Sequence, residues 1–153
     1  MKFLSGVTVV GMLAAGLPSV QGLTRRVNAP FTVSKLSAGA TPHSSVGYIE
    51  LTWSYGGLNQ TKCSAQPGTY QVFPTVAKTV CSDPSTSFNL TKRSDGGADL
   101  ELWHEVAPGT SASAVHTIQA SEIVWTNQQS PTGTVQVYAG PQNFTVNAIF
   151  PKN

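Results

Sequence analysis

The side chains best able to do chemistry are few and lie far apart in the sequence. His43, His104 and His116 lack the Cys/His spacing that is typical of a zinc site. No Gly-x-Ser-x-Gly elbow occurs, and no phosphate-binding glycine loop precedes a helical pattern. His104 shares the strand phase of two leucines, which indicates a histidine at the edge of the core with a hydrogen-bond partner. The sequence therefore predicts no catalytic, cofactor-binding or metal-binding residue, and no enzyme.

The acidic residues give the only alternative that includes catalysis. A glycosidase needs two carboxyl groups facing each other about 5–10 Å apart. Glu101 and Glu105 share one strand face, and Glu122 follows in the next part of the chain. Acids on the outward phase of a strand are usually only a solvated face, so a small hydrolase is the weakest of three functions considered.

One tryptophan stands on the polar side of its strand. Trp103 alternates in phase with Asp99, Glu101 and Glu105, so it is predicted to project away from the core. Tryptophan is favoured in contacts where one side stays wet, so Trp103 is a candidate contact for a protein partner or a glycan. The alternative is that a loop or a second sheet covers it, because so large an aromatic rarely stays bare.

The other two tryptophans have apolar neighbours. Trp53 and Trp125 are therefore predicted to belong to the core.

Two cysteines and three Asn-x-Thr sequons carry the expected covalent chemistry. Cys63 and Cys81 are the only cysteines, and in an oxidising compartment they are expected to form one disulfide. Asn59, Asn89 and Asn143 are acceptors for N-glycosylation in principle. Asn89 and Asn143 also fall on the outward phase of their predicted strands.

The elements that hold these residues are predicted to be strands. Apolar and polar residues alternate in short runs separated by Gly, Pro, Ser, Asn and Asp, without a convincing helical period. The pattern predicts an all-β chain, a single compact antiparallel β-barrel or β-sandwich of about eight to ten short strands. The predicted strands are 31–37, 46–55, 61–64, 69–73, 87–93, 98–106, 115–120, 122–126, 134–139 and 143–150.

The first 22 residues have the form of a secretory signal peptide. Lys2 precedes an apolar stretch that ends at Pro18, and Val20 and Gly22 suit the −3 and −1 positions of a cleavage site. The apolar stretch is shorter than the roughly 20 residues needed to span a bilayer. The sequence predicts a secreted, extracellular protein without membrane attachment.

A dibasic pair follows the leader directly. Arg25 and Arg26 have the form of a kexin-type processing site, so 23–26 is predicted to be a short propeptide and 27–153 the mature domain. Removing residues 1–26 leaves six basic residues against seven acidic ones, so the formal charge changes from +2 to −1. A chain without a second basic cluster is not expected to bind nucleic acid or an anionic membrane.

Several stretches of the chain resemble one family of fungal secreted proteins. The similarity spans most of residues 31–149 as a pattern of strands and turns, without a single diagnostic motif. The stretches that carry it are CSDPSTSFNL, the SDGG turn, IQASEIVW, SPTGTVQVYAGPQNFTVNA and FTVSKLSAGATPHSS. They are similar to the AA1-like family, whose named members are the major Alternaria allergen and hypersensitive-response elicitors.

The resemblance implies a compact β fold and a non-enzymatic role. It implies an effector or elicitor that binds host extracellular proteins in the plant apoplast, and in some members an allergen. The allergen prototype has two disulfides within the domain and a further cysteine that links a dimer, whereas this chain has two cysteines in all. One bridge and a monomer or non-covalent oligomer are therefore expected, and no binding residue carries over. The second function considered is a cell-wall or glycan-binding module that uses Trp103.

Overall fold

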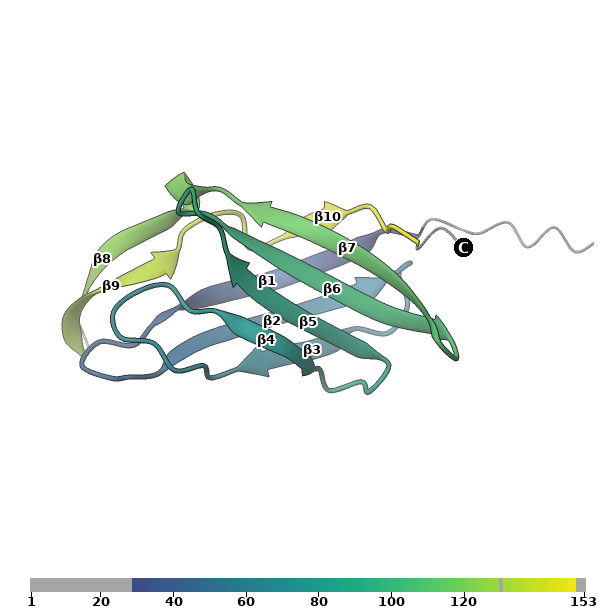
Figure 1. Ribbon diagram of the computed structural model, residues 1–153, viewed down its shortest axis with the longest axis horizontal. Helices are drawn as coiled ribbons and strands as arrows, with labels where there is room; N and C mark the ends of the chain where they lie inside the picture. The colour runs from purple at the N-terminus through teal and green to yellow at the C-terminus, as the bar shows by residue number, and fades with distance from the viewer. Residues whose placement is uncertain (1–28, 130, 151–153) are drawn as a thin grey trace, which may run out of the picture.

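The computed structural model describes residues 29–129 and 131–150, and in them the chain forms two antiparallel sheets (Figure 1). One sheet has the order β3-β2-β1-β9-β8, with β10 also paired to β1, and the other has the order β4-β5-β6-β7. The elements are β1 Phe31–Ala40, β2 Gly47–Tyr55, β3 Thr61–Ala65, β4 Val76–Val80, β5 Thr86–Lys92, β6 Ala98–Ala107, β7 Thr110–Ile118, the 3₁₀ turn η1 Ala120–Glu122, β8 Ile123–Gln129, β9 Thr132–Tyr138 and β10 Phe144–Val146. The all-β prediction is confirmed, and the two sheets are stacked as a sandwich.

The core lies between the inner faces of the two sheets. Successive strand residues point to opposite faces, and the predicted alternation matches the observed burial. The fully buried large side chains of β2, β5 and β6 are Ile49, Trp53, Phe88, Leu90, Leu100 and Leu102. Each buried leucine or phenylalanine stabilises the fold by about 1.5–3 kcal/mol relative to an exposed one.

The two sheets are connected at both sides of the sandwich. At one edge the disulfide between Cys63 on β3 and Cys81 after β4 joins the sheets, with Cα atoms 4.4 Å apart; the predicted bridge is confirmed. At the other edge β10 pairs with β1, and the chain beyond it makes a bridge between Ile149 and Ser113 of β7. The Ser113 N–H donates to the Ile149 carbonyl at 2.9 Å, and the Ile149 N–H donates back at 2.6 Å. The C-terminal segment therefore ties the first sheet to the second.

The predicted strands differ from the observed ones in several places. The strand predicted at 115–120 is β7, which begins earlier, at Thr110, and ends at Ile118. The run 69–73 lies outside the strands, and it covers the core with the buried ring of Phe73. Strand β4 was not predicted, because only its Val76 is buried and a register shift before Thr79 removes the alternation. The last predicted strand, 143–150, is shorter as β10. Its apolar residues on the predicted inward phase do pack partly buried against the core: Phe144, Val146, Ala148 and Phe150.

Trp125 was predicted to be buried, and this prediction is wrong. Its side chain is 55% exposed, although it shares the strand phase of Ile123, which belongs to the core. In Figure 1 the β8–β9 hairpin extends past the end of the four-stranded sheet. Trp125 lies on the face of this hairpin opposite to the buried Val135, and it is exposed there.

Candidate functional site

Trp103 lies at the centre of a row of side chains that crosses the outer face of the four-stranded sheet. The register places Ser87 of β5 on one side of it and Ser113 of β7 on the other. Val80 of β4 pairs with Ser87, and Ile149 pairs with Ser113. Side chains directly opposite each other in antiparallel strands share a face. We call these five residues the Trp103 row.

The neighbours of Trp103 leave its indole partly buried. The Lys78 ammonium lies 4.2 Å from the ring centroid, a cation–π contact that covers one side of the ring. On the β7 side a shallow hollow of about 370 Å³ opens beside the indole, between Gly109, Ser111, Ser113 and Ile149. Within residues 29–129 and 131–150, the Lys78 side chain is the cover recorded over the face of this indole, which stays partly exposed.

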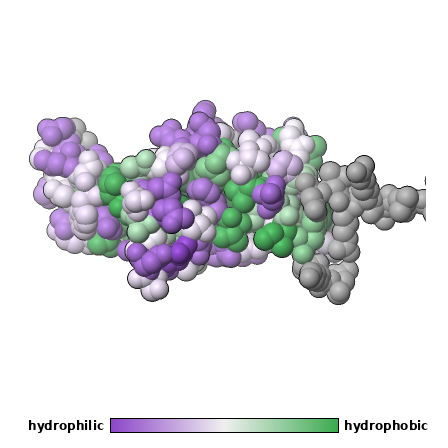
Figure 2. All heavy atoms as spheres, turned by 90° about the horizontal axis from the view of Figure 1, so that it is seen from above, coloured by the Kyte–Doolittle hydropathy of each residue, from purple (hydrophilic) through white to green (hydrophobic). Residues whose placement is uncertain are grey.

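Exposed aliphatic side chains lie at both ends of the Trp103 row. Val80 is 61% exposed and Ile149 is 59% exposed. Val115, two residues from Ser113 on β7, is also exposed and is the cross-strand partner of Glu101 on the same face. Figure 2, which views the molecule from the β7–β10 edge, shows apolar residues gathered along this edge between polar surfaces. The combination of a tryptophan, aliphatic groups and a few charges is typical of the centre of a protein–protein interface.

The acidic residues that could have served a hydrolase are held in separate structural contacts. The Glu101 carboxylate accepts a hydrogen bond from Asn89 Nδ2 at 2.9 Å. Glu105 Oε1 accepts one from the Gly109 N–H in the β6–β7 turn. Glu122 closes a capping box at η1 by accepting from the Gln119 N–H at 2.7 Å. These contacts explain the acids as structural groups and give no support to a catalytic pair.

A second hollow, of about 190 Å³, lies at one end of the sandwich beside the disulfide. Tyr55 and His104 wall it, with ring centroids 5.1 Å apart. Thr61 and Thr86 lie at its base, both buried, with hydroxyl oxygens 3.3 Å apart.

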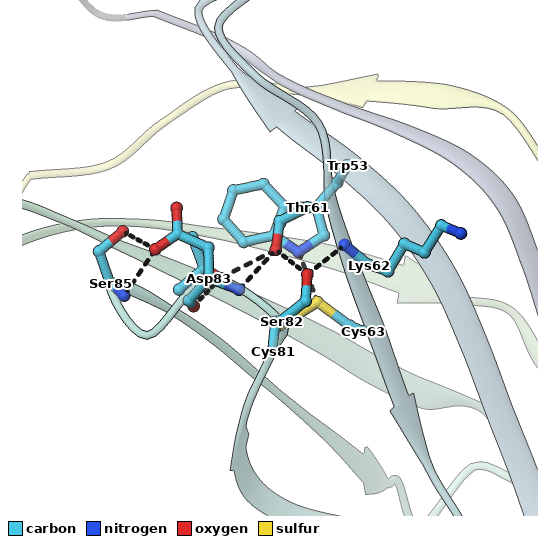
Figure 3. Close-up of a disulfide and its surroundings, with 9 residues drawn as sticks. Trp53, Thr61, Lys62, Cys63, Cys81, Ser82, Asp83 and Ser85 are labelled. Atoms are coloured by element: carbon cyan, nitrogen blue, oxygen red, sulfur yellow. Dashed lines mark hydrogen bonds between the residues drawn. A yellow bond between two sulfur atoms is a disulfide. The ribbon is translucent and has the colours of Figure 1, made fainter.

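The polar groups beside the disulfide tie β3 to the chain that follows β4 (Figure 3). Thr61 Oγ1 lies 3.1 Å from Ser82 Oγ and accepts a hydrogen bond from the Asp83 N–H. The Ser82 hydroxyl also accepts from the Lys62 N–H at 3.0 Å. Trp53 Nε1–H donates to Cys63 Sγ at 3.0 Å, so the bridge also satisfies a buried indole.

Ser85, Asp83 and His104 meet at the rim of this hollow, but their order does not suit nucleophilic catalysis. A triad needs the histidine between the nucleophile and the acid. Here the Ser85 hydroxyl stands in the middle: it donates to Asp83 Oδ1 at 2.8 Å and lies 3.5 Å from His104 Nδ1. The Ser85 N–H and hydroxyl hold the pKa of Asp83 below its ordinary value. The group is a turn stabilised by a carboxylate, and His104 has the edge-of-core position expected for it.

Metal binding receives no support from the described part of the chain. In residues 29–129 and 131–150, no group of three His, Cys, Asp or Glu side chains could hold a metal ion. The same residues contain no helix long and apolar enough to cross a membrane.

His116 is a titratable group in an unusual position, because its Nε2 is buried. It lies between β7 and β10, where its ring stacks on Phe144 with centroids 3.7 Å apart. Among the described residues its Nε2 has no hydrogen-bond partner, although the atom is buried. Burial lowers the pKa of His116, against the opposing effect of the Glu122 carboxylate. The contact between β7 and β10 therefore contains a histidine whose burial favours the neutral form.

The three sequon asparagines have different surroundings. Asn59 is exposed in the β2–β3 connection, and Asn143 is exposed before β10, where its Oδ1 accepts from the Lys35 N–H. That contact leaves Asn143 Nδ2, the atom that carries a glycan, outside the hydrogen bond. Asn89 is partly buried in the middle of the four-stranded sheet, and its Nδ2 is bonded to Glu101.

Sequence reasoning did not find the contact of Lys78 with Trp103, and it misplaced Trp125. Lys78 lies 25 positions before Trp103 on a strand that was not predicted, so no local pattern could have paired them. Trp125 was assigned to the core because of its apolar neighbours, but it lies on the face of the β8–β9 hairpin opposite to the buried Val135 and is exposed. The leader, the dibasic site and the proposed mature N-terminus lie outside the described residues.

No family model matches the chain, and no curated protein is significantly similar to it. The resemblance to the AA1-like family therefore stays a prediction.

Proposed function

We propose that residues 27–153 act outside the cell as a non-enzymatic, effector-like fungal protein that binds a host extracellular protein through the Trp103 row. The observation that supports this proposal most is the position of Trp103. It is partly exposed on a rigid central strand, between two small serines, with exposed Val80 and Ile149 at the ends of the row. Tryptophans set in such surroundings commonly dominate the energy of protein–protein interfaces.

The charges around Trp103 indicate the kind of partner surface. Lys78 and Glu101 flank the indole, and Glu105 lies further along the same strand. A partner that buries the indole would need an apolar centre and polar groups of both signs around it, as most interfaces between soluble proteins have. The disulfide is compatible with an extracellular site of action, and the resemblance to the AA1-like family supports a host protein as the partner.

Capture from plant apoplastic fluid tests this proposal. Tagged, oxidised 27–153 is compared with Trp103→Ala and with Trp125→Ala, a matched loss of one partly exposed indole on the other sheet. We expect at least one host protein to be captured by the wild type and by Trp125→Ala, and lost with Trp103→Ala. Capture of the same proteins by all three chains, or of none beyond those bound by an unrelated β domain, would contradict the proposal.

A further inference from the structure

The end of the β8–β9 hairpin presents a second aromatic surface, on the opposite sheet from the Trp103 row. Three consecutive cross-strand pairs lie beyond Ile123 on the Trp125 side of the hairpin, which extends past the end of the four-stranded sheet (Figure 1). We call these residues the overhang face. Its members are Trp125 and Gln136, Asn127 and Thr134, and Gln129 and Thr132.

The overhang face combines one exposed indole with amides and hydroxyls only. Trp125 is 55% exposed, and Asn127, Gln129 and Thr134 are exposed beside it. From Ile123 to Phe150 the sequence contains no Asp, Glu, Lys, Arg or His. The surface therefore has hydrogen-bond donors and acceptors of both kinds but no charge to attract an ionic ligand.

The hairpin that carries this face is held in place. Seven residue pairs join β8 to β9. The Gln136 N–H donates to the Gln71 carbonyl at 2.7 Å, and Gln136 Oε1 accepts from the Phe73 N–H at 2.8 Å. Phe73 itself is buried in the core. Because Gln136 is the cross-strand partner of Trp125, these bonds fix the strand beside the indole and keep the face preorganised, which lowers the entropy lost on binding.

From this chemistry we infer that the overhang face binds a neutral glycan. The apolar C–H face of a sugar ring can stack on the Trp125 indole, while its hydroxyl groups hydrogen-bond to the amides and hydroxyls of the neighbouring pairs. A polyanionic or polycationic polymer would find no counter-charge on the hairpin itself. The inference does not depend on the Trp103 row, which lies on the other sheet.

A second copy of the chain is the main competing occupant. Strand β8 is the edge of its sheet, and an uncharged edge strand can pair with another edge. Apart from Trp125, however, the side chains of the overhang face are polar. The aliphatic residues of β8, which could drive association, are Ile123 and Val124, and they are buried or partly buried.

Affinity electrophoresis of the oxidised, secreted protein tests the inference. Gels contain one of three neutral polymers, laminarin, xyloglucan or galactomannan, or the polyanion polygalacturonate. We expect at least one neutral polymer to retard the wild type, with no retardation by polygalacturonate. Trp125→Ala should weaken binding about tenfold or more, Trp125→Tyr should retain most of it, and Trp103→Ala should leave it unchanged.

Two further measurements keep the result clear. Trp125 is exposed, so Trp125→Ala should keep the wild-type unfolding temperature. The double variant Asn127→Ala/Thr134→Ala should also weaken binding of the neutral polymer. Three results would overturn the inference: no retardation by any neutral polymer, equal retardation of Trp125→Ala and wild type, or a dimer of the wild type that Trp125→Ala converts to monomer without any effect of polymer. Trp103→Ala distinguishes the two surfaces. A failure of glycan binding at the overhang face would therefore not decide the capture experiment, which tests the Trp103 row.

Discussion

Removal of the disulfide should cost more stability than the loss of the covalent link alone. The bridge closes a loop with a sequence separation of 18 residues, for which the chain-entropy relation gives about 3 kcal/mol of stabilisation. Cys63 Sγ also accepts the hydrogen bond of the Trp53 indole, which is 1% exposed. A buried donor left without a partner costs roughly 1–3 kcal/mol.

These two contributions can be separated with three forms of the protein. In the reduced wild type the sulfur still accepts the indole hydrogen bond, so the free energy of unfolding should fall by about 3 kcal/mol. In Cys63→Ala/Cys81→Ala the acceptor is also lost, and the fall should reach about 4–6 kcal/mol. Domains of this size are stable by about 5–15 kcal/mol in total, so the alanine pair should be marginally stable.

Urea unfolding followed by circular dichroism at neutral pH measures both values by linear extrapolation. Trp53→Phe is the control, because it removes the indole donor. In that background the alanine pair should lose only the amount that reduction removes. Equal stability of the reduced wild type and the alanine pair would refute the role of the indole hydrogen bond. A loss on reduction below about 1 kcal/mol would refute the loop-closure argument.

Three further predictions concern acid, glycans and processing. Because burial lowers the pKa of His116 in the folded state, the unfolded chain binds its proton first. The free energy of unfolding should therefore be constant above the ordinary value near 6.5 and fall below it, and His116→Gln should flatten that fall in urea titrations from pH 7.5 to 5. Glycopeptide mass spectrometry of the secreted protein should find glycans at Asn59 and Asn143, and little at Asn89, whose Nδ2 is bonded in the sheet; full occupancy of Asn89 would show that modification before folding decides the outcome. N-terminal sequencing should give Val27, and a start at Leu23 would disprove dibasic processing but not secretion.

The sequence predicted most of the strands because their side chains alternate. The β5–β6 hairpin is the clearest case: Phe88 and Leu90 are buried, and Gly96 adopts the positive φ of 88° that its turn requires. Cys63 and Cys81 were paired correctly because no other cysteine competes with them. The alternation of side chains and the number of cysteines were sufficient to predict these features.

The remaining features depend on contacts between distant parts of the chain. Alternation shows which face of a strand a residue occupies, but not whether another part of the chain covers it; Trp125 was predicted to be buried because of its apolar neighbours, and it is exposed. The partial cover of Trp103 by Lys78 depends on the register of β4, an edge strand without alternation. The bridge of Ile149 to Ser113 is likewise a long-range contact that no local sequence pattern predicts.

Hydroxyl-radical footprinting of the complex with the captured host protein would test the central proposal most directly. The method reports the oxidation rate of each tryptophan, and Trp125 serves as an internal reference on the other sheet. We predict that the partner slows oxidation of Trp103 about tenfold or more, as expected for an indole at the desolvated centre of an interface, while oxidation of Trp125 is unchanged. An unchanged oxidation rate of Trp103 in the saturated complex would contradict the proposal that the Trp103 row is the binding surface.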